Sequence, residues 1–190
     1  MPSLEAGTDG GSEIIRGWHW VDTLTGVAFL TVLALPVAAL VVPLVRRGRP
    51  WRIAVAEVGI VYGTLPWVWM TLIPGSHAGV APRRVSLVPL HDLVTMPGPQ
   101  IVGNLFVFAA LGFLAPLRFA ALASVPRILA LAAGCSIAIE VSQYVFQLDR
   151  VSSVDDVLLN TAGAGLAALA SRRWWLVRAA EPEAAQSVRS

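Results

Sequence analysis

Polar side chains interrupt an apolar stretch of the chain between residues 135 and 163. In its first half they recur at intervals of four, three and four residues, a spacing that places them on one stripe of a helix: Ser136, Glu140, Gln143 and Gln147. An ionised carboxylate at the centre of a membrane helix costs about 2.5–3.5 kcal/mol. We therefore expect Glu140 to be protonated, paired with a cation, or exposed to a water-filled cavity.

The second half of this stretch carries two acids, Asp155 and Asp156, and then the amide Asn160. Asp156 and Asn160 are four residues apart and share a helix face. Arg150, in the turn between the two halves, is the basic residue nearest to Glu140 in sequence. Two plainer readings remain open. The amides could simply hold helices together, and the two acids could favour the positive end of a helix that Ser152 or Ser153 caps.

The composition indicates a polytopic membrane protein. Of the 190 residues, 56% are hydrophobic and 14% are charged, and the mean hydropathy is +0.68. Soluble domains carry about 25% charged residues. All 14 basic residues are arginine and the net charge is +2, which gives no sign of a face that binds nucleic acid. The single cysteine, Cys135, excludes a disulfide within the chain and any Cys-x-x-Cys site.

Apolar runs predict an all-α bundle of about five transmembrane helices. We place the bundle at residues 22–177, between a polar tail over residues 1–21 and a disordered tail over residues 178–190. Pro36 and Pro43 are expected to kink or end the first span, and Gly59 and Gly63 predict a close helix contact along the second. The expected spans are Thr23–Val45, Ile53–Ile73, Ile101–Leu117, Ile128–Leu148 and Val154–Val177.

Arginines in the connecting segments favour one orientation of this bundle. If the first loop is cytoplasmic, ten arginines lie inside and four lie outside. We therefore expect a multi-pass protein of the bacterial cell membrane, with the N-terminus outside and the C-terminus in the cytoplasm. The long loop over residues 74–100 then lies outside, from where Arg83 or Arg84 could reach toward Glu140.

This orientation brings uncommon polar residues to one depth. At about 1.5 Å per residue, Glu140 lies roughly 12 Å below the outer edge, Asn160 roughly 10 Å, and Asn104 about one turn. The short turn at Arg150 makes the last two helices neighbours. The sequence therefore predicts a polar pocket in the outer leaflet, formed by Asn104, Ser136, Glu140, Gln143, Arg150, Asp155, Asp156 and Asn160.

Three motifs lie between residues 86 and 165. They are SLVPL at Ser86–Leu90, GNLFVFAALGFLAPL at Gly103–Leu117, and SIAIEVSQ followed by R-x4-DD-x3-N-x2-G, which begins at Arg150. Together they resemble the VanZ-like family of small bacterial membrane proteins, and the third is the most specific. Three positions depart from the family pattern. Ala110 replaces a proline expected to kink the span, while Ser86 and Ser153 stand where the family often has Asn and Asp.

The resemblance implies an integral protein of the cell envelope. The founding member of the family is linked to resistance to the glycopeptide antibiotic teicoplanin. Most VanZ-like proteins come from bacteria without that resistance cluster, so the resemblance makes antibiotic resistance a hypothesis and not an assignment. The expected partners are membrane lipids and a lipid-linked cell-wall precursor or a glycopeptide, with no nucleic acid.

Three functions fit the predicted pocket. The first is binding of a lipid-linked or amphipathic envelope ligand. The second is a membrane enzyme that acts on an envelope lipid, with Glu140 or Asp156 as general acid or base. The third is a small proton-coupled transporter with Glu140 as the relay, although no internal repeat supports it. We expect no cofactor and no metal site, because no ligand spacing supports a metal held by Asp155, Asp156 and His91.

Overall fold

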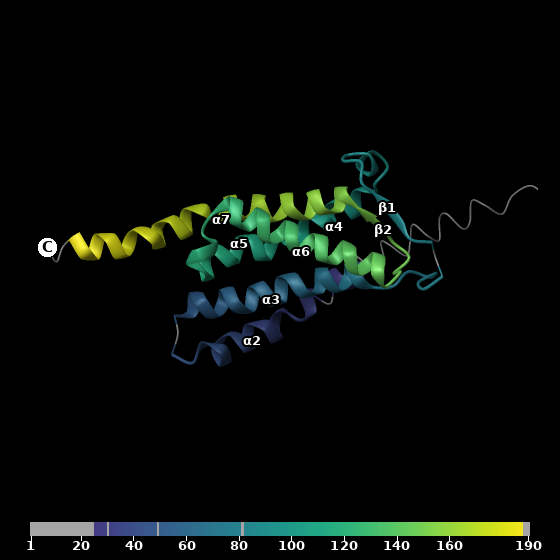
Figure 1. Ribbon diagram of the computed structural model, residues 1–190. Helices are drawn as coiled ribbons and strands as arrows, with labels where there is room; N and C mark the ends of the chain where they lie inside the picture. The colour runs from purple at the N-terminus through teal and green to yellow at the C-terminus, as the bar shows by residue number, and fades with distance from the viewer. Residues whose placement is uncertain (1–24, 30, 49, 81, 188–190) are drawn as a thin grey trace, which may run out of the picture.

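The structure, a computed structural model, describes residues 25–29, 31–48, 50–80 and 82–187, with side chains described up to Trp175. The tail expected over residues 1–21 lies outside these ranges. The helices run side by side as an elongated bundle (Figure 1), which confirms the all-α fold class. They are α2 (Leu35–Arg46), α3 (Trp51–Leu72), α4 (Gly98–Val107), α5 (Ala109–Arg118), α6 (Val125–Val145) and α7 (Val154–Ser187).

Length and apolar composition qualify three described segments to cross a membrane: α3, α6, and α4 together with α5. A fourth candidate is Thr25–Leu33 followed by α2, two helices that meet at a bend of 45°. The bend falls beside Pro36, as expected, because proline lacks an N–H donor and its ring clashes with the carbonyl four residues earlier. The expected count of five spans would also include α7, which is less apolar because acids, an amide and small residues occupy its first half.

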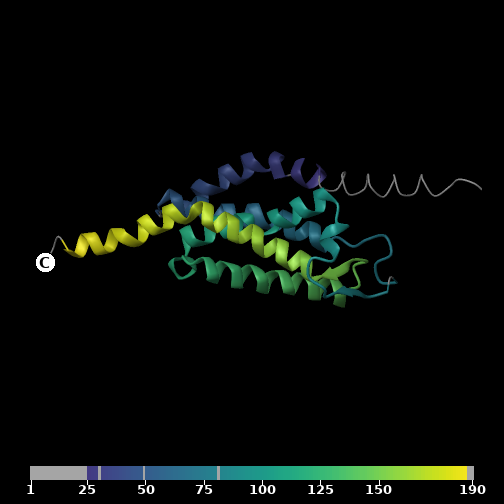
Figure 2. The same cartoon turned by 90° about the horizontal axis from the view of Figure 1, so that it is seen from above.

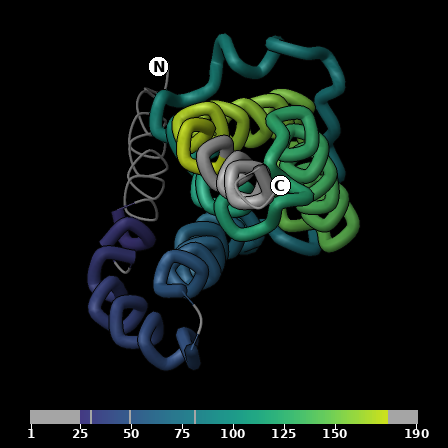
Figure 3. The backbone as a smooth tube through the Cα atoms, turned by 90° about the vertical axis from the view of Figure 1, so that its left-hand side faces the viewer, coloured from purple at the N-terminus to yellow at the C-terminus, as the bar shows by residue number. Residues whose placement is uncertain are grey.

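The surface of the bundle is apolar, and its interior is made largely of small residues. Leu44 and Trp69 are about 70% exposed, whereas Ala115, Ala132, Ala164 and Ala168 are fully buried. This inverted pattern suits a bundle surrounded by lipid, where small residues let helices approach closely. α2 and α6 lie on opposite edges of the bundle, with the other helices between them (Figures 2 and 3).

Helix α7 packs against α4, α5 and α6, and two glycines permit its closest approaches. A Cβ atom on Gly163 would collide with the backbone of Leu105 in α4, and one on Gly112 of α5 would collide with the backbone of Ala164. The predicted contact at Gly59 and Gly63 also forms, since both glycines of α3 face side chains of α5. Backbone contact at these points fixes the distances between the helices that surround the pocket residues.

The third predicted span is broken at Phe108, between α4 and α5. Phe108 has φ −117° and ψ 14°, and its side chain is 3% exposed. Ala110 occupies the place of the family's proline, so the break does not need that residue. The close contacts of Leu105 and Gly112 with α7 flank the break on its two sides.

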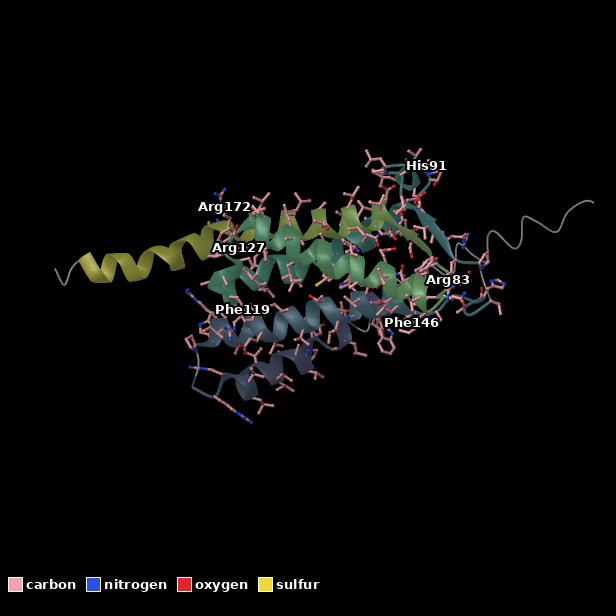
Figure 4. All side chains as sticks on the ribbon, viewed as in Figure 1. Arg83, His91, Phe119, Arg127, Phe146 and Arg172 are labelled. Carbon is pink, nitrogen blue, oxygen red and sulfur yellow. The ribbon has the colours of Figure 1, made fainter. Side chains whose placement is uncertain are left out.

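Two short strands join distant segments at one end of the bundle, which we call the strand end. β1 (Arg84–Ser86) pairs in parallel with β2 (Val151–Ser153), and Ser86 lies opposite Ser153. Figure 4 shows Arg83 and Phe146 at the strand end, with Phe119 and Arg127 at the opposite end. The sequence did not predict these strands, because three residues are too few for a periodic pattern.

Candidate functional site

A polar cavity of about 250 Å³ opens at the strand end, between the end of α3, the start of α4 and the α6–β2–α7 hairpin. Six of the eight predicted pocket residues line it: Asn104, Glu140, Gln143, Arg150, Asp156 and Asn160. Met70, Thr71, Arg84, Gln100, Gly103, Ile139, Asp149 and Val151 complete the wall. Candidate spans therefore contribute residues to a cavity that carries both signs of charge.

Glu140 holds the two arms of the hairpin together. Its Oε2 atom accepts a hydrogen bond from the backbone N–H of Ser153 at 2.9 Å, and its backbone carbonyl accepts one from the Ser152 hydroxyl at 3.0 Å. The residue is 8% exposed. Ser153 also caps α7, because its Oγ accepts the N–H of Asp155 at 3.2 Å. The predicted serine cap is thus confirmed at Ser153.

Two amides link α7 to its neighbours at the level of the cavity. Asn160 Nδ2 lies 2.7 Å from Ser136 Oγ of α6, and both residues are almost completely buried. Ser136 therefore lies behind the wall. Asn104 of α4 donates to the carboxylate of Asp156. These two hydrogen bonds connect α7 to α6 and to α4 at the level of the cavity.

Gln143 connects α6 to the carboxyl end of α3. Its Nε2 atom donates to the backbone carbonyl of Thr71 at 2.8 Å. Since a carbonyl oxygen only accepts, this contact fixes which atom of the amide is nitrogen. Gln143 Oε1 is then a buried acceptor to which no described residue donates. Such an acceptor costs about 1–3 kcal/mol unless a donor reaches it.

Arg150 is held beside the carboxyl groups by the end of α3. Its guanidinium donates to the carbonyl oxygens of Met70 and Ile73 at 3.3–3.4 Å. Burial lowers the pKa of the Arg150 guanidinium, while the charges of Asp156, Glu140 and Asp149 oppose that shift. Arg150, named from the sequence as the basic residue nearest to Glu140, thus lies within the same partly buried group of charges as Glu140, Asp149 and Asp156.

Asp155 contacts the long loop and not the cavity. It is 1% exposed, and its carboxylate accepts the backbone N–H groups of Leu90, Asp92 and Leu93, the last two at 2.9 and 3.0 Å. These amides begin the 3₁₀ helix η1 (Asp92–Val94) of the long loop. We call this arrangement the Asp155 clamp. Asp155 was predicted in the pocket, but it does not line the cavity and instead holds the loop beside it.

A second acid strengthens the Asp155 clamp. Asp92 Oδ2 accepts the Ser153 hydroxyl at 2.7 Å. Hydrogen bonds from Ser86, Ser153 and His91 lower the pKa of Asp92 to about 2. Ser86 and Ser153, two of the three departures from the family pattern, are thus neighbours that both donate hydrogen bonds to this carboxylate. His91 lies 3.1 Å from Asp92 on an exposed part of the loop, and no group of three metal-binding side chains occurs among the described residues.

Several cavity residues were not predicted. Gln100 and Thr71 carry no distinctive sequence signal, since each is a single polar residue at a helix end. Asp149 lines the cavity and accepts the N–H of His77 at 3.0 Å, which ties the long loop to the hairpin. The predicted stripe through Gln147 was wrong, because α6 ends at Val145 and Gln147 has a φ of +50°.

An apolar groove of about 350 Å³ lies on the other side of the hairpin. It shares Glu140 with the polar cavity. The rest of its lining comes from the exposed face of α6, from Ser152 and Ser153 of β2, from Val154 and Val157 of α7, and from Val85 of β1 and the following Leu87. Alternation along β1 explains this arrangement, because Arg84 faces the cavity while Val85 faces the groove. At the groove, the guanidinium of Arg83 lies 5.4 Å from the ring centre of Tyr144.

The comparison with protein families identifies one match. The family model described as VanZ/LLP1 matches residues 60–176, which is 117 of the 190 residues. The chain matched none of the curated proteins and none of the solved structures with which it was compared. The match includes α4 to α6, both strands, the cavity and most of the described part of α7. The chain belongs to the VanZ-like family.

Proposed function

We propose that the polar cavity binds the headgroup of a lipid-linked or amphipathic ligand of the cell envelope. The observation that carries this proposal is the cavity itself, a space of about 250 Å³ with charged and amide walls between helices of membrane-spanning length. Buried polar groups are costly in a membrane, and they commonly mark a path or a binding site.

The orientation derived from the arginines would open this cavity toward the outer leaflet, where lipid-linked wall precursors and glycopeptides meet the membrane. Under that orientation, the protein would protect the envelope by holding such a molecule. A link to teicoplanin resistance belongs to this proposal as one consequence. The enzyme and the proton-coupled transporter remain predictions from the sequence.

The first prediction concerns the cavity walls. Glu140→Ala and Asn160→Ala, expressed at the level of the parent protein, should each weaken binding of a fluorescent lipid-linked wall precursor at least tenfold. Loss of one hydrogen bond to a charged group alone is worth about 1.5–3 kcal/mol. Binding is measured by fluorescence polarisation in detergent micelles, and teicoplanin susceptibility is measured in cells that carry each variant.

Ser142→Ala is the matched control. Ser142 is next to Gln143 in α6, but its hydroxyl donates to Ala138 of its own helix and does not line the cavity. Control and parent should bind alike. If both cavity variants keep full binding and unchanged susceptibility, the proposed function is wrong.

A further inference from the structure

We infer that the cavity selects a headgroup in which an amine with N–H donors is joined to a phosphate, as in phosphoethanolamine. This inference rests on the proposed function and names the chemical class of its ligand. It is argued from wall oxygens that receive no hydrogen bond from the described residues and from the two guanidinium groups that line the same cavity.

Oxygen atoms of several wall residues receive no hydrogen bond from the described residues. Gln143 Oε1 is buried without a donor from the described residues, and its identity as oxygen follows from the bond of Nε2 to Thr71. Glu140 and Asp156 each use one carboxylate oxygen, on Ser153 and Asn104 respectively. Their second oxygens receive no hydrogen bond that the described residues supply.

A primary amine suits these three acceptors. An ammonium group has three N–H donors on one atom and carries the charge that two carboxylates attract. Gln143 lines the cavity and is 5% exposed, so its Oε1, to which no described residue donates, lies next to the space that the amine would occupy. A quaternary ammonium carries the same charge but has no N–H, and a glycerol headgroup has donors but no positive charge.

The guanidinium groups provide the complementary half of the site. Arg84 lines the cavity from the exposed strand β1, and Arg150 lines it from the turn before β2. Guanidinium groups bind phosphate oxygens with paired hydrogen bonds. Together with Glu140, Asp149 and Asp156, the wall has two basic and three acidic side chains, a mixture that suits a headgroup with both an amine and a phosphate.

The second prediction tests this selectivity on the unmodified full-length protein in dodecyl maltoside micelles. Dihexanoyl phosphatidylethanolamine and its mono-, di- and trimethylated forms remove one N–H at a time at constant phosphate and chain. We expect affinity, measured by calorimetric titration, to fall stepwise and by at least tenfold in total, because each methyl group removes one hydrogen bond to a wall acceptor. Gln143→Met should flatten this series, and Ser142→Ala should leave it unchanged.

Other outcomes separate the inference from the function on which it rests. Equal affinity across the methylated series, with all binding lost in Glu140→Ala, would overturn the amine and leave the proposed function in place. Dihexanoyl phosphatidylglycerol binding as tightly as phosphatidylethanolamine would also overturn it. Free O-phosphoethanolamine binding as tightly as the lipid would overturn a lipid as the source of the headgroup. No binding of any of these lipids or of the wall precursor would overturn both.

Discussion

At the scale of residues, adjacent acids of the hairpin do different work. Asp155 and Asp156 follow one another at the start of α7, and the sequence placed both in the pocket. In the structure Asp156 lines the cavity and binds Asn104, whereas Asp155 binds the amides of the long loop. Successive residues of a helix point about 100° apart, so two neighbours at a helix start readily serve different partners.

The third prediction separates these two roles. Asp155→Asn removes the charge from a carboxylate that accepts three backbone N–H groups. We expect the loop to open more easily by about 2 kcal/mol, so that amides of residues 90–93 exchange with solvent deuterium roughly 30-fold faster. Mass spectrometry of hydrogen exchange measures this rate.

Asp156→Asn is the matched control for the loop, since Asp156 contacts none of these amides. It should leave loop exchange at the parent rate while weakening ligand binding. Equal exchange in both variants would show that the Asp155 clamp does not hold the loop.

Much of the site at this scale could be predicted from the sequence. Helical spacing identified Glu140 and Gln143 on one stripe, and depth counting brought Asn104 and Asn160 to their level. The role of Asp155 could not be predicted, because its partners are backbone amides 62–65 residues away in a loop without periodicity. Every residue except proline carries a backbone N–H, so residue types do not reveal which amides of the loop bind Asp155.

At the scale of elements, close helix contacts determine the cavity. The sequence predicted a close contact from Gly59 and Gly63 but gave no partner for Gly163 and Gly112. Those two glycines bring α7 into backbone contact with α4 and α5. The break at Phe108 and both strands were also missed. Each strand is only three residues long, and its partner lies in a distant segment of the chain.

The fourth prediction tests the approach of α7 to α4. Gly163→Ala places a methyl group against the backbone of Leu105, so we expect destabilisation of about 1–3 kcal/mol from overpacking. The measurement is thermal unfolding of the purified protein in detergent, followed by size-exclusion chromatography after heating.

Gly134→Ala is a matched control on α6, because no atom lies within 4 Å of a Cβ built there. This variant should be as stable as the parent or gain about 0.5–1 kcal/mol, since alanine favours a helix over glycine. If the two variants unfold at the same temperature, the contact at Gly163 does not constrain the packing of α7 against α4.

At the scale of the whole molecule, successive helices carry the chain from one end of the bundle to the other (Figure 1). The loop over residues 74–80 lies at the strand end, and the turn between α5 and α6 lies at the opposite end. The membrane-protein class and helix count near five came from composition and apolar runs. Which end faces outward depends on the arginine bias and stays a prediction.

The fifth prediction tests which end of the bundle faces the outside of the cell. In a Cys135→Ala background, a membrane-impermeant maleimide should label Ser76→Cys in intact cells and Ala121→Cys only after permeabilisation. Both positions are exposed, and Cys135 is the only native cysteine. The reverse labelling pattern would place the cavity on the cytoplasmic side and overturn an outer-leaflet ligand.

The Asp155 clamp also has a consequence for the order of biosynthesis. The loop amide of Leu90 is translated 65 residues before the carboxylate that it binds, and β1 likewise waits for β2. A ribosome must therefore deliver the first turn of α7 before the loop can settle and before Asp156 and Asn160 complete the wall. A chain that stops before Val154, or whose last helix fails to insert, retains α2 to α6 but has no assembled site.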